Sequence, residues 1–245
     1  MNQFKIIGLA AMVMAFSLLS IPSRAQEMKI VATNLSAPEK SIISISSLAA
    51  AGDLINLKNE LNAGLEAGLT VNEIKEILVH LYAYCGFPRS IRGLQTFMEV
   101  LKERKAKGIT DNEGKLASEI KNDATKYERG KKILEELTKA PQPETLSGYS
   151  AFAPTIDTFL KEHLFADIFE RDVLTYGQRE LVTISVIATI GDAEPMLKSH
   201  LGISLNVGIS PNQLQEFISV IKIYSGEKNA KAAQKVLDGV LKTQK

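Results

Sequence analysis

The sequence contains one cysteine, Cys85, no tryptophan, three histidines and only 6% aromatic residues. A lone cysteine excludes an intrachain disulfide and a cysteine-rich zinc site. With 29 basic against 28 acidic residues, the formal net charge is +1, so nothing favours binding to nucleic acid or to an anionic membrane. The sequence also lacks a glycine-rich phosphate loop, a Gly-x-Ser-x-Gly elbow and any metal-ligand spacing. We therefore expect no metal and no cofactor.

The first 25 residues have the layout of a secretory signal peptide. Lys5 supplies a positive charge, residues 6–19 are an apolar run, and Ser23 and Ala25 are small residues three and one before a cut. The run is shorter than the roughly 20 residues that a membrane-spanning helix needs. We expect cleavage after Ala25, a periplasmic or secreted protein, and no membrane attachment after cleavage.

An internal repeat organises the rest of the chain. LNAGLEAGLTVNEIKEILVHLYAYCG (61–86) aligns without gaps over LGISLNVGISPNQLQEFISVIKIYSG (201–226). Upstream, residues 40–53 align over residues 179–192 after a one-residue gap. The repeat predicts one helical unit written twice. We expect a signal peptide at 1–25, a first unit at 26–107, a connecting helix and linker at 108–150, and a second unit at 151–245.

Helix start and stop signals occur at matching places in the two units. Capping-box patterns begin at Ser36, Thr70, Thr175 and Ser210. Glycines close the second helix and the third helix of each unit, at Gly68, Gly86, Gly208 and Gly226. No window alternates like a strand, so we predict an all-α fold.

The remaining segments are also predicted to be mainly helical. Residues 108–140 are charged and are predicted to be mostly helical. Residues 153–169 are predicted to form an amphipathic helix whose apolar anchors are Phe159, Leu160, Leu164 and Phe165. The first helix of each unit, 42–51 and 181–190, is nearly apolar all round. Such helices must be buried inside the fold, against another subunit, or both.

At GLTVNEIKEILVHLYAYCGFP (68–88) the sequence resembles the carboxymuconolactone decarboxylase family, relatives of the AhpD alkylhydroperoxidases. The second half agrees through YERGKKILEEL (127–137), FLKEHLFADIFER (159–171), RELVTISVIATIGD (179–192) and His200. The resemblance implies an AhpD-like all-helical bundle in two tandem repeats. It also implies a homo-oligomer, a trimer or a dimer, because a tandem chain is similar to a covalent dimer of single units.

The thiol-redox branch of this family uses a Cys-x-x-Cys pair one turn before a histidine, with a glutamate on the preceding helix. Counted back from His200, those cysteines would fall at Ala193 and Met196, so a dithiol peroxidase cycle lacks its nucleophile. His200 and Glu180 match the family's histidine and glutamate. A histidine can pass a proton each way near neutral pH, and a nearby carboxylate fixes its tautomer. We expect these two residues to be catalytic.

The first unit has Glu60 in place of His200 and Ser41 in place of Glu180. It carries its own polar cluster instead, at the end of its third helix: Glu76, His80, Tyr84, Cys85 and Arg89. Glu76, His80 and Tyr84 share one helix face because they are spaced i, i+4. His80 and Glu76 are further catalytic candidates, and Arg89 could hold a substrate carboxylate with a forked pair of hydrogen bonds.

The second unit has Val220, Ser225 and Asn229 in place of His80, Cys85 and Arg89, so each unit is polar where the other is not. One hybrid site built from both units, or one active and one degenerate site, fits this pattern better than two equal sites. Tyr84, Cys85, Tyr224 and Glu216 are expected to line the site. Cys85 reads as a small pocket residue, because a serine replaces it in the second unit.

We expect an exported, cofactor-free lyase that decarboxylates a small carboxylated lactone or a related acid. Two alternatives remain open: a peroxidase-type activity that uses Cys85, and a non-catalytic oligomeric binding protein whose sites have drifted.

Overall fold

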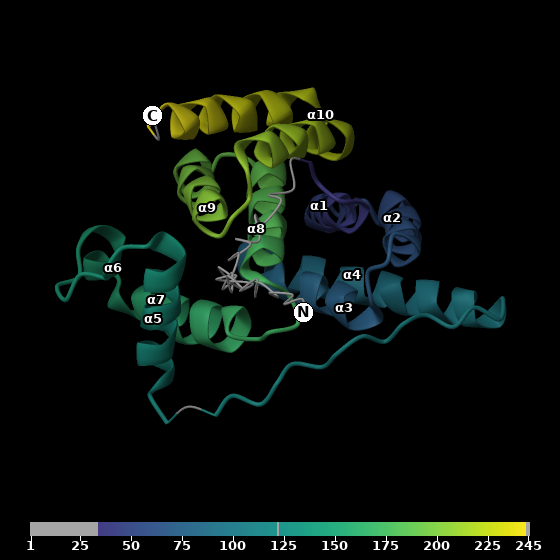
Figure 1. Ribbon diagram of the computed structural model, residues 1–245, viewed down its shortest axis with the longest axis horizontal. Helices are drawn as coiled ribbons and strands as arrows, with labels where there is room; N and C mark the ends of the chain where they lie inside the picture. The colour runs from purple at the N-terminus through teal and green to yellow at the C-terminus, as the bar shows by residue number, and fades with distance from the viewer. Residues whose placement is uncertain (1–33, 122, 244–245) are drawn as a thin grey trace, which may run out of the picture. The chain divides into compact units, whose positions relative to one another are not determined.

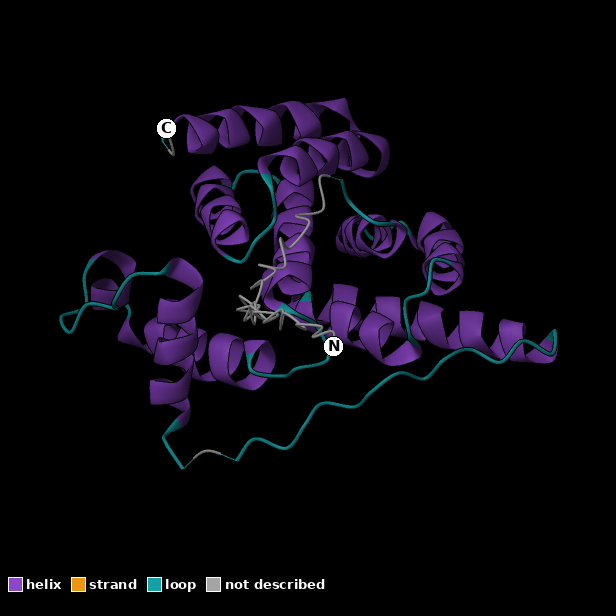
Figure 2. Ribbon diagram, viewed as in Figure 1, coloured by secondary structure: helices purple, strands orange, loops and turns teal. Residues whose placement is uncertain are grey.

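The computed structural model describes residues 34–121 and 123–243, and the expected signal peptide at 1–25 lies outside them. Figure 2 shows this part of the chain as helices and loops, without strands. The all-α prediction is confirmed. No helix in the described ranges combines the length and the apolar character needed to cross a membrane.

The two units have the same order of helices (Figure 1). The first consists of α1 (Ala37–Ala51), α2 (Leu54–Glu66), α3 (Val71–His80) and α4 (Tyr82–Ala106). The second consists of α8 (Tyr176–Ile190), α9 (Glu194–Asn206) and α10 (Pro211–Lys242), and α10 corresponds to α3 and α4 together. The four predicted capping boxes are all formed, at Ser36, Thr70, Thr175 and Ser210.

Two glycines divide long helices at the predicted places. Gly86 has φ 80° and ψ 162°, and Gly226 has φ 84° and ψ 169°, so α4 and α10 each consist of two helical stretches joined at a kink. A side chain at such a positive φ would be strained, which explains glycine at both positions. The first stretch of each pair carries the tyrosine of the repeat, Tyr84 or Tyr224.

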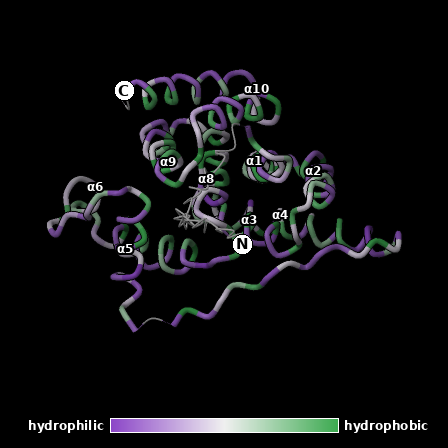
Figure 3. The backbone as a smooth tube through the Cα atoms, viewed as in Figure 1, coloured by the Kyte–Doolittle hydropathy of each residue, from purple (hydrophilic) through white to green (hydrophobic). Residues whose placement is uncertain are grey.

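The apolar helices α1 and α8 form the centre of the fold. They pack against each other, and each forms a hairpin with the helix that follows it, α2 or α9. Ile42, Ile45, Val182 and Ile184 are fully buried. The prediction of burial inside the fold is therefore confirmed. Figure 3 shows the matching pattern in α10, which is hydrophobic on the side that faces the helices beneath it and hydrophilic on the other.

The segment between the units differs from the prediction. Among its described residues, 109–121 and 123–125 form no helix, and the helix α5 spans only Lys126–Thr138. Tertiary hydrogen bonds replace the helical ones, because Val71 N donates to Asn112 O and Asn72 N donates to Glu113 O. Arg104 also binds Asp111 through a salt bridge of 2.7 Å.

A small second core forms around α5. It packs α5 against the π-helix η1 (Phe159–Phe169) and α9 through buried apolar residues of these three helices. The short helices α6 (Gly148–Phe152) and α7 (Pro154–Thr158) precede η1, and α7 packs against both α6 and η1. Leu164 and Phe165 are buried as predicted, whereas Phe159 is 60% exposed. A π-helix closes i to i+5 hydrogen bonds and so does not keep the face that a 3.6-residue period defines. For this reason the prediction for Phe159 was wrong.

Candidate active site

His200 and Glu180 meet across the hairpin of α8 and α9. His200 Nδ1 lies 2.9 Å from Glu180 Oε2. The Glu180 side chain is fully buried, whereas 14% of the His200 side chain is exposed, so the pair reaches solvent at the imidazole. Among the described residues no hydrogen-bond partner contacts His200 Nε2, and Glu180 Oε1 is a buried oxygen without a partner. The pair can therefore hold the proton of Nδ1 and exchange a proton at Nε2.

Tyr84 brings the first unit to this pair. Its ring stands edge-on to the His200 ring, with 5.8 Å between centroids. Its hydroxyl is buried near Thr183 and makes no hydrogen bond of good geometry within residues 34–121 and 123–243. Burial, and next the charge of Glu180, raise the pKa of Tyr84 above its ordinary range, so the phenol stays protonated and can only act as a neutral hydrogen-bonding group. The site therefore contains residues from both units.

His80 lies behind Tyr84 and is fully buried. Arg179 Nη1 lies 3.2 Å from His80 Nδ1, and Thr183 Oγ1 lies 2.9 Å from His80 Nε2. A guanidinium group can only donate, so Nδ1 must accept and Nε2 must carry the proton. Burial, then the positive charge of Arg179, lower the pKa of His80 well below its ordinary value. Since both ring nitrogens are occupied, His80 supports the site and does not face a substrate.

Glu76, the other catalytic candidate of the first unit, does not bind His80. The buried Glu76 carboxylate instead accepts hydrogen bonds from two guanidinium groups, those of Arg171 at 2.9 Å and Arg179 at 2.8 Å. A carboxylate that is removed from water needs charged partners, and two arginines satisfy it better than one neutral imidazole. Glu76 therefore acts on His80 only through Arg179.

Arg89 and Cys85 lie near each other in α4, on either side of the kink at Gly86. The Arg89 side chain is exposed, and its guanidinium lies over Gly52, the residue that ends α1. No contact joins it to His200 or Glu180 among the described residues, so the structure does not bring this expected carboxylate ligand into the cluster. The Cys85 thiol donates to Leu81 O at 3.2 Å, and burial raises its pKa to about 11.

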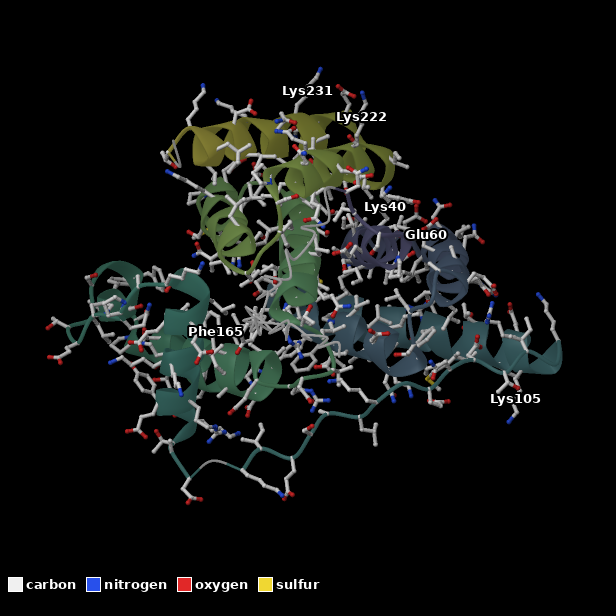
Figure 4. The ribbon with its side chains drawn as sticks, in the orientation of Figure 1. Lys40, Glu60, Lys105, Phe165, Lys222 and Lys231 are labelled. Carbon is white, nitrogen blue, oxygen red and sulfur yellow. The ribbon has the colours of Figure 1, made fainter. Side chains whose placement is uncertain are left out.

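A second cluster repeats the arrangement with the units exchanged. Tyr224, from the second unit, lies against Glu60 of the first, and Ser44 Oγ donates to Glu60 Oε2 at 2.8 Å. The salt bridge between Lys40 and Glu216, at 2.6 Å, stands where the pair of Arg179 and Glu76 stands in the first cluster. Figure 4 labels Lys40 and Glu60 on the neighbouring helices α1 and α2. Tyr224 and Glu216 therefore belong to this cluster and not to that of His200.

Three residues of the histidine cluster were not predicted from sequence as functional: Arg171, Arg179 and Thr183. Arg179 is completely buried in a nearly apolar helix, although an arginine side chain always carries a charge. That contrast was the available signal, because a buried charge is almost always paired or functional. Its partners could not be read from the sequence, since Glu76 is 103 positions away.

Two grooves of the described surface lie apart from His200 and Glu180. One of about 680 Å³ runs between α9 and the end of α10, and its lining includes Pro195, Lys198 and Val236. Another of about 440 Å³ lies at the start of α8. No group of three or more histidine, cysteine, aspartate or glutamate side chains in the described ranges is placed to hold a metal ion.

Comparison with known proteins agrees with the repeat. The model of the carboxymuconolactone decarboxylase family matches twice, at residues 24–97 and 154–239. A 4-carboxymuconolactone decarboxylase of Acinetobacter baylyi is 27% identical over 122 residues, which cover 49% of this chain and 90% of that relative. The chain is thus a tandem member of the carboxymuconolactone decarboxylase family, with two copies of the family's helical unit.

Proposed function

We propose that this protein is a cofactor-free decarboxylase of a small carboxylated lactone or a related acid. The observation that carries the proposal is the contact of 2.9 Å between His200 Nδ1 and the buried Glu180, which leaves Nε2 free for a substrate on a partly exposed ring. The family and the curated relative, whose name describes a decarboxylase, support the same reaction.

The proposed reaction needs an acid at the site. The bond between the ring carbon and the carboxylate breaks, carbon dioxide leaves, and the electron pair stays on the carbon. His200 in its protonated form donates the Nε2 proton to that carbon and becomes neutral, and it regains a proton from water before the next turnover. Glu180 accepts the Nδ1–H hydrogen bond throughout and so keeps the imidazole in one orientation.

The two alternatives receive less support. A peroxidase based on Cys85 requires a thiolate, and a thiol with a pKa of about 11 is almost entirely protonated at neutral pH. A drifted, non-catalytic site would leave His200 without Glu180 in reach, whereas the two side chains are in contact. The decarboxylase proposal therefore fits the geometry best.

The experiment follows carbon dioxide release and the ultraviolet absorbance of 4-carboxymuconolactone with the purified protein. We expect turnover in the wild type and a loss of at least about 100-fold in His200→Gln, because one positioned acid contributes about that factor. Glu180→Gln should lose about 10- to 100-fold, since it removes the orienting partner of the imidazole. His163→Gln is the matched control, because His163 is exposed on η1.

An inactive wild-type protein that is folded would remove this substrate. Full activity in His200→Gln would remove the mechanism while leaving the reaction.

We also propose export, with cleavage after Ala25, and assembly into a homo-oligomer. Mass spectrometry of the protein from its native host should give a mature chain that begins at Gln26, and a chain that begins at Met1 would contradict export. Light scattering of the same sample should give a multiple of the chain mass, whereas a monomer would contradict assembly.

A further inference from the structure

We propose that Arg179 is a positioning residue that holds His80 as the neutral Nε2–H tautomer, so that His200 is the one imidazole of the cluster that exchanges a proton. The inference rests on the proposed function for its consequence in turnover. Its structural part, the tautomer of His80, can be tested without any substrate.

The contacts of Arg179 define its role. It is fully buried, and it donates through Nη2 to Glu76 Oε1 at 2.8 Å and through Nη1 to His80 Nδ1 at 3.2 Å. The face of its guanidinium lies 5.9 Å from the centre of the Phe169 ring. A planar guanidinium held by a carboxylate on one side and an aromatic ring on another has one orientation. The donor that faces His80 is therefore fixed.

The position of each proton follows from that donor. Because Arg179 occupies Nδ1, the His80 proton must sit on Nε2 and point at Thr183 Oγ1. The Thr183 hydroxyl in turn donates to Arg179 O at 3.0 Å. Each polar atom of this loop then has a complementary partner, and a proton on Nδ1 would place two donors face to face.

The charges around His80 oppose a second cation there. The charged or titratable groups of the cluster come from every element packed against it: Glu76 on α3, Tyr84 on α4, Arg171 after η1, Arg179 and Glu180 on α8, and His200 on α9. Glu76 is already shared by two arginines, and Glu180 is bound to His200. No carboxylate is left to stabilise a protonated His80.

The consequence concerns His200. A second imidazolium beside it would repel the proton that the proposed reaction donates to carbon. Keeping His80 neutral leaves the proton of the cluster on the imidazole that reaches solvent. Arg179 thus acts on the reaction through His80 and does not need to touch the substrate.

The first test is nuclear magnetic resonance of the full-length protein with ¹⁵N-labelled histidine. The chain has three histidines, so single glutamine variants assign every signal. We expect His80 to show a protonated Nε2 and an unprotonated Nδ1 that do not change between pH 5.5 and pH 8. A protonated Nδ1, or an imidazolium at pH 6, would overturn the proposal whether or not the protein turns over any substrate.

The second test removes the donor. Arg179→Met leaves Glu76 with only one cationic partner and could fail to fold, so it is combined with Glu76→Gln, which removes the excess charge. In the folded double variant we expect the neutral His80 ring to carry its proton partly on Nδ1, because the donor that faced this atom is gone. We also expect His80 to take up a second proton at a higher pH than in the wild type, because the charge of Arg179 is removed while the burial remains. Arg92→Met, at an exposed arginine of α4, is the matched control. A folded double variant in which His80 Nδ1 stays unprotonated and Nε2 stays protonated would overturn the proposal.

If turnover is present, its pH profile gives a readout that a purely structural role would not move. In the double variant kcat/KM should fall at low pH as His80 takes up a proton, because a second imidazolium opposes proton donation beside it, and the Arg92→Met control should keep the wild-type profile. An unchanged profile, although His80 takes up a proton, would overturn the link to His200. An inactive wild type would remove the proposed function and leave the tautomer assignment standing.

Discussion

The Tyr84 ring of the first unit stands edge-on to the His200 ring of the second, with 5.8 Å between centroids. The two residues lie on different copies of the repeat, yet the cluster around the proposed acid includes both. Because Glu76, His80 and Tyr84 come from one unit and Arg179, Glu180 and His200 from the other, the site is complete only when both units fold.

The contact between α5 and η1 predicts opposite effects for two helical glycines. A Cβ at Gly130 would lie 1.7 Å from Lys161 O, so Gly130→Ala must push the two helices apart and should cost about 2–3 kcal/mol of unfolding free energy. A Cβ at Gly239 in α10 meets nothing within 4 Å, so Gly239→Ala should stabilise by about 0.5–1 kcal/mol. Urea unfolding compares the two variants, and equal effects would contradict the packing described.

His80 predicts an acid-sensitive stability. Its pKa in the folded protein lies well below 6.5, whereas the unfolded chain takes up a proton on it near that pH. Above pH 6.5 neither state is protonated, so the contribution is constant. As the pH falls below 6.5 only the unfolded state gains the proton, and the unfolding free energy drops by up to about 1.4 kcal/mol per pH unit.

Urea unfolding between pH 5 and pH 6.5 tests this. His80→Gln should show a smaller slope than the wild type, while His163→Gln, at an exposed position, should keep most of it. Identical slopes in wild type and His80→Gln would mean that His80 is protonated in the folded protein.

Cys85 is predicted to react slowly. With a pKa of about 11, raised by burial and only partly offset by Arg89, the thiol is roughly one part in a few thousand thiolate at pH 7.5. Alkylation by iodoacetamide should therefore be about 100-fold slower in the native protein than in urea. Treatment of the native protein with iodoacetamide should leave turnover in place, because Cys85 takes no part in the proposed reaction. Equal native and denatured rates would revive the thiol-based alternative.

The second cluster can be probed through Tyr224. Burial, and next the charge of Glu60, raise the pKa of Tyr224 to about 12. Glu60→Gln removes the charge but not the burial, so the pKa should fall part of the way towards 10, as followed by phenolate absorbance. Glu66→Gln changes another carboxylate of α2 that is exposed, and it should leave the titration unchanged. An unchanged pKa of Tyr224 in the Glu60→Gln variant would contradict the contact between the two side chains.

The sequence was sufficient to predict contacts that are local along the chain. Glu180 and His200 lie on consecutive helices joined by a short turn, so a hairpin had to bring them near each other, and the glycine kinks at Gly86 and Gly226 followed from the repeat. The placement of each unit's tyrosine in the other unit's cluster was only partly predictable. Complementary polar positions suggested a hybrid site, but not that Tyr224 would meet Glu60.

The errors came from tertiary partners. The polar segment before α5 has helix-forming residues, yet backbone bonds to Val71 and Asn72 keep it extended. Glu76 sits one turn from His80 on α3, yet it binds Arg171 and Arg179 because a buried carboxylate requires cations. Neither arginine is near Glu76 in sequence, so helix periodicity alone could not identify them.

Each unit places its tyrosine in the cluster of the other unit: Tyr84 lies against His200, and Tyr224 lies against Glu60. This arrangement affects how substitutions act on the two clusters. In a symmetric homodimer every substitution appears in both sites at once, so a change that harms one harms both. Here the partners are joined in one chain, and a substitution at position 60 or 200 alters a single cluster. Joining the two halves thus allows one cluster to contain histidines while the other contains Glu60, Ser44 and Lys40.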